Sequence, residues 1–328
     1  MNTKDFQTNS SQNASSKCVS IVSPVYNESE GIAFFTEAVA KSLSKVDMNW
    51  ELILCVDPST DGTERIIRKL CEADPRIKMI RFSRKFGQDI AVFAGLHYAT
   101  GDSVVVMDSD LQDPPDVVVE MIQAWQSGAL IVLARRVSRG DEPWLKKLTS
   151  KYFYRFLNRF AKVDIPLDTG DFRLLDRSVV TELNRFKESR PFLKGLVSLV
   201  GYETIVVEFH RPDRKDGITK YNKFFGGYGS ALNGIVGFST ILLNISVVGG
   251  LLCSALSILV GIGYEIAKIL GHSFPTGNPT IVLFVTFLGG LNLLAIGILG
   301  LYVERIHEEV KERPRFIVQE LIGFEDKN

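Results

Sequence analysis

From residue 18 to about residue 209, short apolar runs alternate with amphipathic stretches. The β-branched apolar runs predict strands at 18–25, 51–56, 79–82, 103–107 and 130–134. Apolar positions at helical spacing predict helices at 31–44, 61–73, 88–100 and 115–128. Alternating strands and helices are typical of an α/β fold with a mostly parallel sheet. In such sheets, ligands bind beyond the carboxyl ends of the strands.

Two long uncharged segments follow this region. No Lys, Arg, Asp or Glu occurs between Lys223 and Glu265, or between Lys268 and Glu304. Within them, 242–264 and 280–302 are each about 23 residues long, or roughly 34 Å as helix, which is enough to cross a bilayer. A pair of buried helices in a soluble protein is the alternative. The length of both runs and the short loop between them favour a transmembrane hairpin.

The distribution of charge predicts how this hairpin is oriented. The loop 271–279 contains no Lys or Arg, whereas basic residues cluster beyond the other ends of both helices. By the positive-inside rule, both ends of the hairpin are cytoplasmic. The aromatic-rich segment 221–240 predicts an interfacial amphipathic helix leading into the first span. The polar segment 1–17 has no signal-peptide pattern and predicts a disordered tail. We therefore expect a plasma-membrane protein whose α/β part lies in the cytoplasm.

Overall composition adds few constraints. Lys plus Arg equals Asp plus Glu, at 38 each, so the net charge favours no particular partner. The four cysteines form no Cys-x-x-Cys pair, which predicts reduced thiols without a metal or redox role. The basic, aromatic stretch 143–163 predicts an amphipathic helix packed on the sheet, with a face resting on anionic lipid as the alternative. No nucleic-acid-binding motif accompanies it.

Acidic and polar residues gather where the predicted strands end. Asp108 and Asp110 follow the strand 103–107, and if the chain turns there, both can face one metal ion, with Gln112 adding a neutral oxygen. Such oxygen ligands suit Mg²⁺ or Mn²⁺, which can neutralise a diphosphate leaving group. Because 26–28 and Asp57 also fall at strand ends, we expect these groups to converge on one crevice.

Two further motifs suggest chemistry at this crevice. Asp171 follows a glycine and precedes an apolar run, so its carboxylate can deprotonate an acceptor; a capping aspartate in a turn is the alternative. Arg214, Thr219 and Lys220 stand just before the interfacial segment and can bind a phosphate through charge-assisted hydrogen bonds. Positive-inside charge beside a membrane span is the alternative, and the Gly-x-Thr-Lys core favours phosphate binding.

Together, these motifs resemble glycosyltransferase family 2, with the GT-A fold. Within that family they resemble the bacterial polyprenyl-phosphate (bactoprenol) glycosyltransferases, which are close to dolichol-phosphate mannose synthases. The resemblance covers about residues 18–320. The matching stretches are 24–28, 57–63, 84–87, 94–96, 108–114, 170–174 and 214–220.

The resemblance implies a domain order and a role for each motif. It implies a catalytic domain at 18–220, an interfacial helix at 221–240, a two-helix transmembrane hairpin at 241–303 and a cytoplasmic tail at 304–328. The residues implied to bind the nucleotide-sugar are Pro24, Tyr26, Glu28, Asp57 and Asp108. The residues implied to hold Mg²⁺ or Mn²⁺ on the diphosphate are Asp108, Asp110 and Gln112. Asp171 would be the base, or would position the acceptor, and the lipid phosphate would be bound by Arg136, Arg214, Thr219 and Lys220.

The implied activity is an inverting transfer of a hexose from a UDP-sugar to undecaprenyl or another polyprenyl phosphate, for modification of cell-envelope glycans. Glucose is the first choice of sugar, ahead of N-acetylglucosamine and galactose, and the family suggests a homo-oligomer. A processive polysaccharide synthase is one alternative, but the sequence lacks the Gln-x-x-Arg-Trp motif of that class. A catalytically decayed membrane scaffold is the other, supported only by Pro58, which stands where the family usually has glycine.

Overall fold

The computed structural model describes residues 17–137, 169–210, 241–271 and 279–325. The chain forms two compact units. The first comprises Met1–Leu148, Ile165–Lys220 and Pro314–Asn328, and the second comprises Thr149–Asp164 and Tyr221–Arg313. Each unit is described by itself below.

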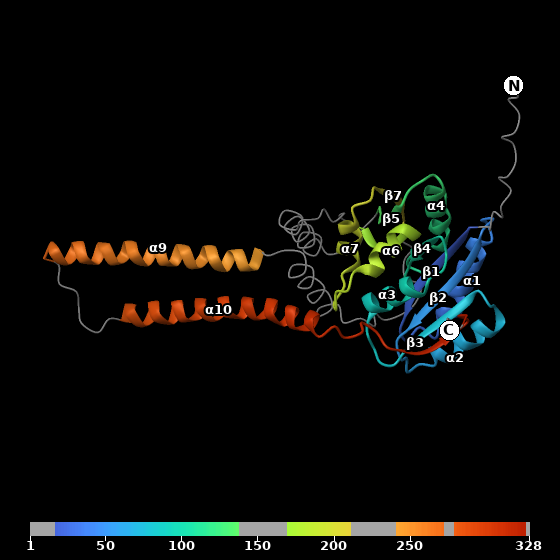
Figure 1. Ribbon diagram of the computed structural model, residues 1–328, viewed down its shortest axis with the longest axis horizontal. Coiled ribbons are helices and arrows are strands. Elements are labelled where there is room, and N and C mark those ends of the chain that lie inside the picture. The colour runs from blue at the N-terminus through green and yellow to red at the C-terminus, as the bar shows by residue number, and fades with distance from the viewer. Residues whose placement is uncertain (1–16, 138–168, 211–240, 272–278, 326–328) are drawn as a thin grey trace, which may run out of the picture. The chain divides into compact units, whose positions relative to one another are not determined.

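The first unit is built on one eight-stranded sheet (Figure 1). Its strands are β1 (Cys18–Val25), β2 (Asn49–Val56), β3 (Ile77–Phe82), β4 (Ser103–Val106), β5 (Ile131–Arg136), β6 (Thr169–Asp176), β7 (Thr204–Phe209) and β8 (Val318–Ile322). They lie in the order β7-β5-β6-β4-β1-β2-β3-β8. The pairs β1–β2, β2–β3, β1–β4 and β5–β7 are parallel, whereas β6 and β8 run antiparallel to their neighbours. The predicted mostly parallel α/β sheet is therefore confirmed.

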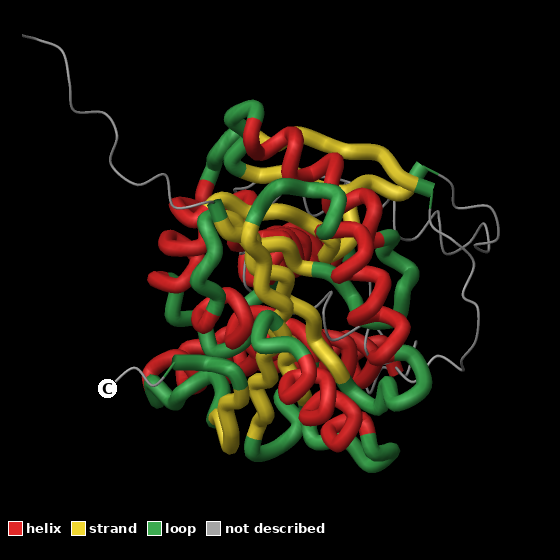
Figure 2. Tube along the Cα trace, turned by 90° about the vertical axis from the view of Figure 1, so that its right-hand side faces the viewer, coloured by secondary structure: helices red, strands yellow, loops and turns green. Residues whose placement is uncertain are grey.

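Helices cover both faces of this sheet (Figure 2). One face carries α1 (Ile32–Leu43), α2 (Thr63–Ala73) and α4 (Pro115–Gln126). The other carries α3 (Gln88–Tyr98), α6 (Arg177–Arg185) and α7 (Leu193–Val200). The strands and helices predicted up to residue 136 are all present, with boundaries that differ by a few residues.

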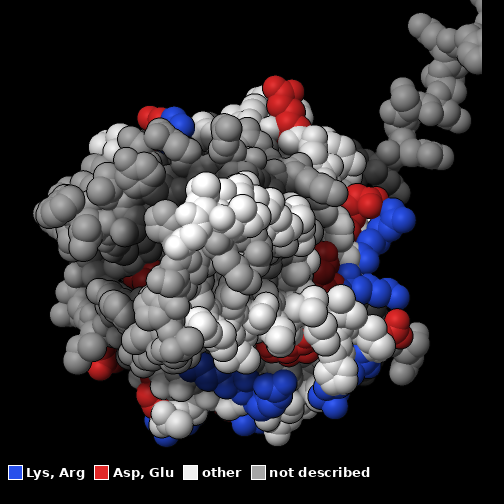
Figure 3. All heavy atoms as spheres, turned by 90° about the vertical axis from the view of Figure 1, so that its left-hand side faces the viewer, with Lys and Arg blue, Asp and Glu red and all other residues white. Residues whose placement is uncertain are grey.

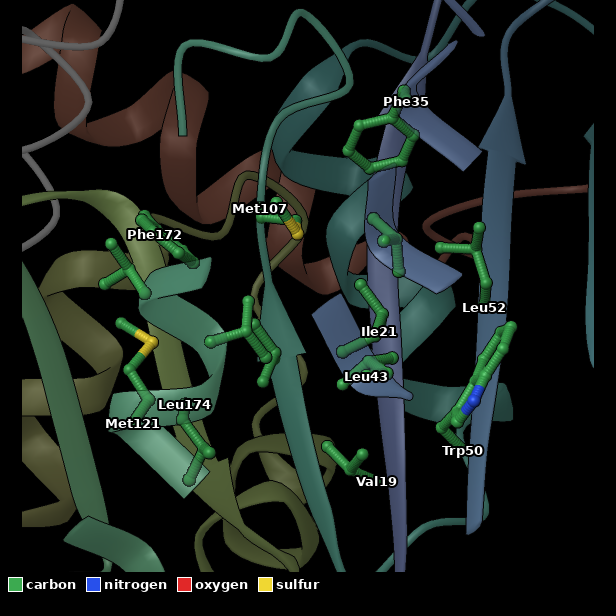
Figure 4. Packing of buried hydrophobic residues seen from close by; sticks show 14 of the residues in the cluster. Val19, Ile21, Phe35, Leu43, Trp50, Leu52, Met107, Met121, Phe172 and Leu174 are labelled. Carbon is green, nitrogen blue, oxygen red and sulfur yellow. The ribbon is translucent and has the colours of Figure 1, made fainter. Parts of the chain in front are cut away.

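The core follows from the alternation of side chains along β1 and β2. Val19 and Ile21 point to the same face and pack with Phe35 of α1 and Leu52 of β2, all fully or almost fully buried (Figure 4). The opposite face packs against α3. There a Cβ on Gly95 would lie 2.2 Å from one methyl of Val22, so only glycine allows this close approach.

The strand β6 is inserted antiparallel between β4 and β5. Ser103 pairs with Asp176 and Val106 pairs with Arg173, so β6 begins at the edge where β4 ends. On its other side, the start of β6 also lies beside the end of β5, since Thr169 pairs with Arg135. This register places the residues around the start of β6 at the carboxyl edge of the parallel strands.

The last strand closes the opposite side of the sheet. We expected a tail at 304–328, but this segment completes helix α10 (Pro279–Val310) and then forms β8, which pairs antiparallel with β3. Arg68 of α2 donates to both carboxylate oxygens of Glu320, and the ring of Phe316 lies edge-on to Phe82. The tail prediction missed β8 because a five-residue strand becomes stable only by pairing with an existing sheet edge.

The described part of the second unit is a helical hairpin of α9 (Ile241–Ile269) and α10. Both helices are longer than the predicted spans and are long and apolar enough to cross a membrane, over Leu243–Gly263 and Phe287–Val310. Large apolar side chains are exposed along both, such as Leu259 at 66% and Leu293 at 72%. In the view from the side of the hairpin, the described atoms at the centre belong mostly to residues other than Lys, Arg, Asp and Glu (Figure 3). The segments 1–16, 143–163 and 221–240 lie outside the described residues.

At the amino end of the sheet, a buried ion pair joins β2 and β3. Glu51 accepts hydrogen bonds from Ser20 Oγ at 2.5 Å, Lys78 Nζ at 2.6 Å and Thr100 N at 2.7 Å. Burial raises the pKa of Glu51, but the hydrogen bonds from Lys78, Ser20 and Thr100 outweigh this effect and hold that pKa below its ordinary value. The carboxylate is therefore ionised in the folded protein and depends on Lys78 for compensation.

We expect Lys78→Met to lower the free energy of unfolding at pH 7 by about 3 kcal/mol, because it leaves Glu51 ionised and without its cation. Because the folded-state pKa of Glu51 lies below its unfolded value of 4.5, the pair stabilises fully above pH 4.5 and less as the pH falls. The difference between variant and wild type should therefore shrink in acid. Chemical denaturation measures both effects.

The matched control is Lys69→Met, which removes an exposed lysine from α2 and should change stability by less than about 0.5 kcal/mol. Equal destabilisation by the two substitutions would show that the buried pair contributes nothing specific.

Candidate active site

The predicted site residues of the first unit meet at the carboxyl edge of the sheet. Pro24 lies in the end of β1, Asp57 directly follows β2 and Asp108 follows β4. Asp171 lies near the start of β6, which the antiparallel register brings to the same edge, and Arg136 ends β5. The convergence predicted from strand ends is therefore present for Asp57 and Asp108, and β6 and β5 bring Asp171 and Arg136 to the same edge.

The turn after β4 is held by hydrogen bonds of its own side chains. Asp110 Oδ1 accepts a hydrogen bond from the backbone N–H of Gln112 at 3.0 Å, and Leu111 adopts a left-handed φ of 58°. Asp108 N donates to Asp113 Oδ2 at 3.2 Å. The hydroxyl of Ser109 donates to the carbonyl of Pro24 at 3.2 Å, which ties the turn to β1.

Helix α3 reaches the same turn through its first residue. Gln88 Nε2 donates to Asp108 Oδ1 at 2.9 Å, so an amide from the β3–α3 loop orients this carboxylate. The sequence reasoning did not single out Gln88. Its place directly after the 84–87 motif, in the connection that follows another parallel strand, is the signal that could have found it.

The oxygen groups of this turn fit a magnesium or manganese ion. Asp108 and Asp110 supply carboxylates, and Gln112 can add an amide oxygen. Among the described residues, no cluster of three or more His, Cys, Asp or Glu side chains forms a complete metal cage. Mg²⁺ is commonly bound by one or two carboxylates together with substrate phosphates and water, so the donor set suits an ion shared with a diphosphate.

All four cysteines are free, as predicted.

Asp57 organises the loop between β3 and α3. It is 4% exposed, and its two carboxylate oxygens accept the backbone N–H groups of Phe86 and Gly87, each at 2.9 Å. Gly87 has a φ of 93°, which only glycine adopts without strain. In the structure, Asp57 thus fixes the 84–87 loop; its contact with a nucleotide stays a prediction.

The loop after β1 is held by side chains from the loop after β2. Asn27, with a left-handed φ of 54°, donates its N–H to Ser59 Oγ at 3.1 Å and accepts from Thr60 N at 2.9 Å. Glu28 N donates to Thr63 Oγ1 at 2.9 Å. These bonds tie the loop after β1 to residues 59–63, which directly follow Pro58, the residue that departs from the family pattern.

Two charged groups stabilise this region further. Burial raises the pKa of Asp61, but hydrogen bonds from Thr63 and Ser29 outweigh it and hold that pKa at about 2. The ammonium of Lys85 lies 3.4 Å from the centre of the Tyr26 ring, as a cation–π pair. The predicted nucleotide-binding residues Tyr26 and Glu28 therefore sit in a loop that is pre-ordered without ligand.

The start of β6 is held from within by a buried arginine. Arg173 is 2% exposed, and its guanidinium donates to the carbonyls of Gly170, at 2.8 Å, and Asp171, at 3.2 Å. Its Nη2 also lies 3.5 Å from Asp171 Oδ1. Arg173 therefore holds the backbone of Asp171 in place and also puts a positive charge next to its carboxylate.

Two residues beside Asp171 were missed by the sequence reasoning as site residues. Asp89 lies in the first turn of α3 and is partly open to solvent. Its pKa is raised to about 6, mainly by desolvation and also by the negative charge of Asp171. The positive charges of Lys194 and Arg173 lower this pKa and offset part of the rise. Lys194, in the first turn of α7, has its Nζ 3.8 Å from Asp171 Oδ1. No sequence motif marks Lys194, because only the tertiary fold brings α7 to this edge.

The predicted acceptor site is only partly within the described structure. Arg136 lies at the end of β5, where its buried Nε has no hydrogen-bond partner among the described residues. Arg214, Thr219 and Lys220 lie outside the described residues.

A comparison with known protein families agrees with this geometry. Residues 20–183 match the family described as Glycosyl transferase family 2. The chain belongs to glycosyltransferase family 2. The match begins in β1 and ends in α6, so it includes every strand that contributes a carboxylate to the candidate site.

Relatives within the family match over nearly their whole length. The chain is 40% identical to the uncharacterized glycosyltransferase YkcC of Bacillus subtilis, over 94% of this chain and 95% of the relative. It is 39% identical to the SfII prophage-derived bactoprenol glucosyl transferase of Shigella flexneri, over 92% and 97%. The crystal structure of glucosyl-3-phosphoglycerate synthase from Mycobacterium tuberculosis with Mn²⁺, UDP and phosphoglyceric acid is 20% identical, with a TM-score of 0.46, covering 67% of this chain and 76% of that one.

We expect Asp57→Asn to lower the free energy of unfolding by about 2 kcal/mol, because an amide nitrogen would replace one of the two oxygens that accept the N–H groups of Phe86 and Gly87. Hydrogen exchange at these two amides should also accelerate. Denaturation together with exchange measurements checks both. Asp47→Asn, at an exposed position, is the control; normal exchange at Phe86 and Gly87 in Asp57→Asn would contradict the role of Asp57.

Proposed function

We propose that this protein is a membrane-bound glycosyltransferase that moves a hexose, glucose by first choice, from a UDP-sugar to a polyprenyl phosphate such as undecaprenyl phosphate. The observation that carries the proposal is the meeting of Asp108, Asp110 and Asp171 at one sheet edge, in a chain that also forms a long apolar hairpin. The name of the Shigella flexneri relative, a bactoprenol glucosyl transferase, supports a lipid acceptor.

The donor half of the site is assigned to the loops after β1, β2 and β4. Pro24, Tyr26, Glu28 and Asp57 would hold the uracil and ribose, in loops that their mutual hydrogen bonds already order. Asp108, Asp110 and Gln112 would bind Mg²⁺ or Mn²⁺ on the diphosphate. When bound, the ion neutralises charge on the departing UDP.

The acceptor half is assigned to Asp171 and Arg136, on β6 and β5, together with residues that lie outside the described structure. Arg136, Arg214, Thr219 and Lys220 would bind the lipid phosphate. A phosphate oxygen forms a bond to the anomeric carbon of the sugar while the bond from that carbon to the UDP oxygen breaks. Attack opposite the departing UDP inverts the anomeric centre. Asp171 would orient the phosphate and take a proton from it if the phosphate arrives as a monoanion.

The membrane half of the proposal rests on α9 and α10. In water, their exposed leucine and isoleucine side chains would be costly, whereas in a bilayer they match the lipid chains. We assign 18–220 as the catalytic domain, 221–240 as an interfacial helix and 241–303 as the transmembrane hairpin of a plasma-membrane protein. Both ends of the hairpin and the catalytic domain would be cytoplasmic, as the charge distribution indicates.

A transfer assay tests the reaction. The full chain in detergent is incubated with undecaprenyl phosphate, Mg²⁺ or Mn²⁺ and labelled UDP-sugars, and lipid-linked label is measured. We expect transfer from one UDP-sugar, with EDTA abolishing it. Asp110→Asn and Asp171→Asn should each reduce kcat about a hundredfold, through loss of metal binding and of acceptor orientation.

Glu37→Gln, at an exposed position on α1, is the control and should keep full activity. Folded wild-type protein that binds UDP and metal but labels no lipid would exclude the polyprenyl-phosphate acceptor. Absence of metal-dependent UDP binding would instead favour a decayed scaffold.

Membrane topology is tested separately. Protein expressed in bacteria should stay in the membrane pellet at high pH and be released only by detergent. An epitope inserted between residues 274 and 275 should be reached from outside intact spheroplasts, and one after residue 328 only after permeabilisation. Epitopes accessible from opposite sides of the membrane at the two ends of the hairpin would contradict the proposed orientation.

A further inference from the structure

A lysine of α7 lies close to Asp171, the carboxylate that we propose orients the acceptor. Lys194 is the second residue of α7, its side chain is 20% exposed, and its Nζ lies 3.8 Å from Asp171 Oδ1. The charge of Lys194 also lowers the pKa of Asp89, whereas the charge of Asp171 raises it. Three separate elements, β6, α3 and α7, therefore bring one ammonium group close to two carboxylates.

Among the described residues, Arg173 also places a positive charge near Asp171, but it already has a structural role. Arg173 is buried and donates to the carbonyls of Gly170 and Asp171, so its guanidinium holds the backbone at the start of β6. Lys194 differs because it is partly exposed and carries three rotatable donors on a flexible stem. It can bond a carboxylate and a second anion at the same time.

An anionic acceptor creates an electrostatic problem at this place. A phosphate that comes close to Asp171 also meets Asp89, and like charges at short range repel strongly where protein replaces water. A cation between the phosphate and these carboxylates removes that repulsion. Lys194 has the position, charge and exposure for this role.

We propose that Lys194 binds the phosphate of the acceptor and bridges it to Asp171. The proposal rests on the function proposed above and adds a residue to the acceptor site. Without acceptor, the ammonium pairs with Asp171; with acceptor bound, it also donates to a phosphate oxygen. Lys194 should therefore affect acceptor binding and leave the UDP-sugar site unchanged.

The test compares Lys194→Met, Lys194→Arg and the control Lys187→Met, which removes an exposed lysine between α6 and α7. Steady-state transfer is measured with the full chain in detergent, varying a short-chain polyprenyl phosphate and the UDP-sugar in turn. We expect Lys194→Met to raise the KM for the polyprenyl phosphate about tenfold to a hundredfold, the worth of one charge-assisted hydrogen bond. The KM for the UDP-sugar should stay within about twofold, and Lys194→Arg should recover most of the loss.

An unchanged acceptor KM in Lys194→Met, or an equal rise in both KM values, would overturn the proposal, and so would a failure of Lys194→Arg to recover. If Lys194→Met is less stable to heat than wild type, Lys194→Gln provides the same comparison with a hydrogen-bonding side chain. A wild-type protein without transfer activity refutes the proposed function, whereas an active wild type with a normal acceptor KM in the variants refutes only the role of Lys194.

Discussion

The antiparallel pairing of β6 with β4 is the constraint on which the candidate site depends. If β6 ran parallel to β4, its first residues would lie at the opposite edge of the sheet, away from the loops that carry Asp57 and Asp108. Because β6 runs the other way, its first residues, including Asp171, lie beside the end of β4. The same strand also places the end of β5, with Arg136, at this edge. Asp57 and Asp108, which we propose for the donor, therefore share one edge of the sheet with Asp171 and Arg136, which we propose for the acceptor.

The loops at this edge are ordered by hydrogen bonds from one another. Asp57 accepts two backbone N–H groups of the β3–α3 loop, and Asn27 exchanges bonds with Ser59 and Thr60. Arg173, within β6, donates to the carbonyls of Gly170 and Asp171 at the start of the same strand. Several polar residues of the motifs thus satisfy backbone groups, which would otherwise remain unpaired at strand ends. A pre-ordered site loses less conformational entropy when a ligand binds.

The last strand of the first unit returns to the sheet after the hairpin. The chain leaves this unit before α9, passes through the apolar hairpin and returns to add β8 to the edge of β3. This pairing covers a strand edge that would otherwise expose unpaired backbone groups. The bonds between Arg68 and Glu320, 252 positions apart in the chain, connect the returning segment to α2. The segment after the hairpin is therefore part of the first unit.

The sequence by itself determined the α/β class, the five strands and four helices up to residue 136, the apolar hairpin and the acidic turn at 108–110. These features are local: the periodicity of apolar residues and the residue types at strand ends are visible within short windows. Only the tertiary structure decided the contacts of Asp57 with the 84–87 loop, the role of Gln88, the pairing of β8 and the approach of Lys194 to Asp171. Each of these joins residues distant in the chain through a register or a packing contact, and single residues carry no local pattern that specifies such a partner.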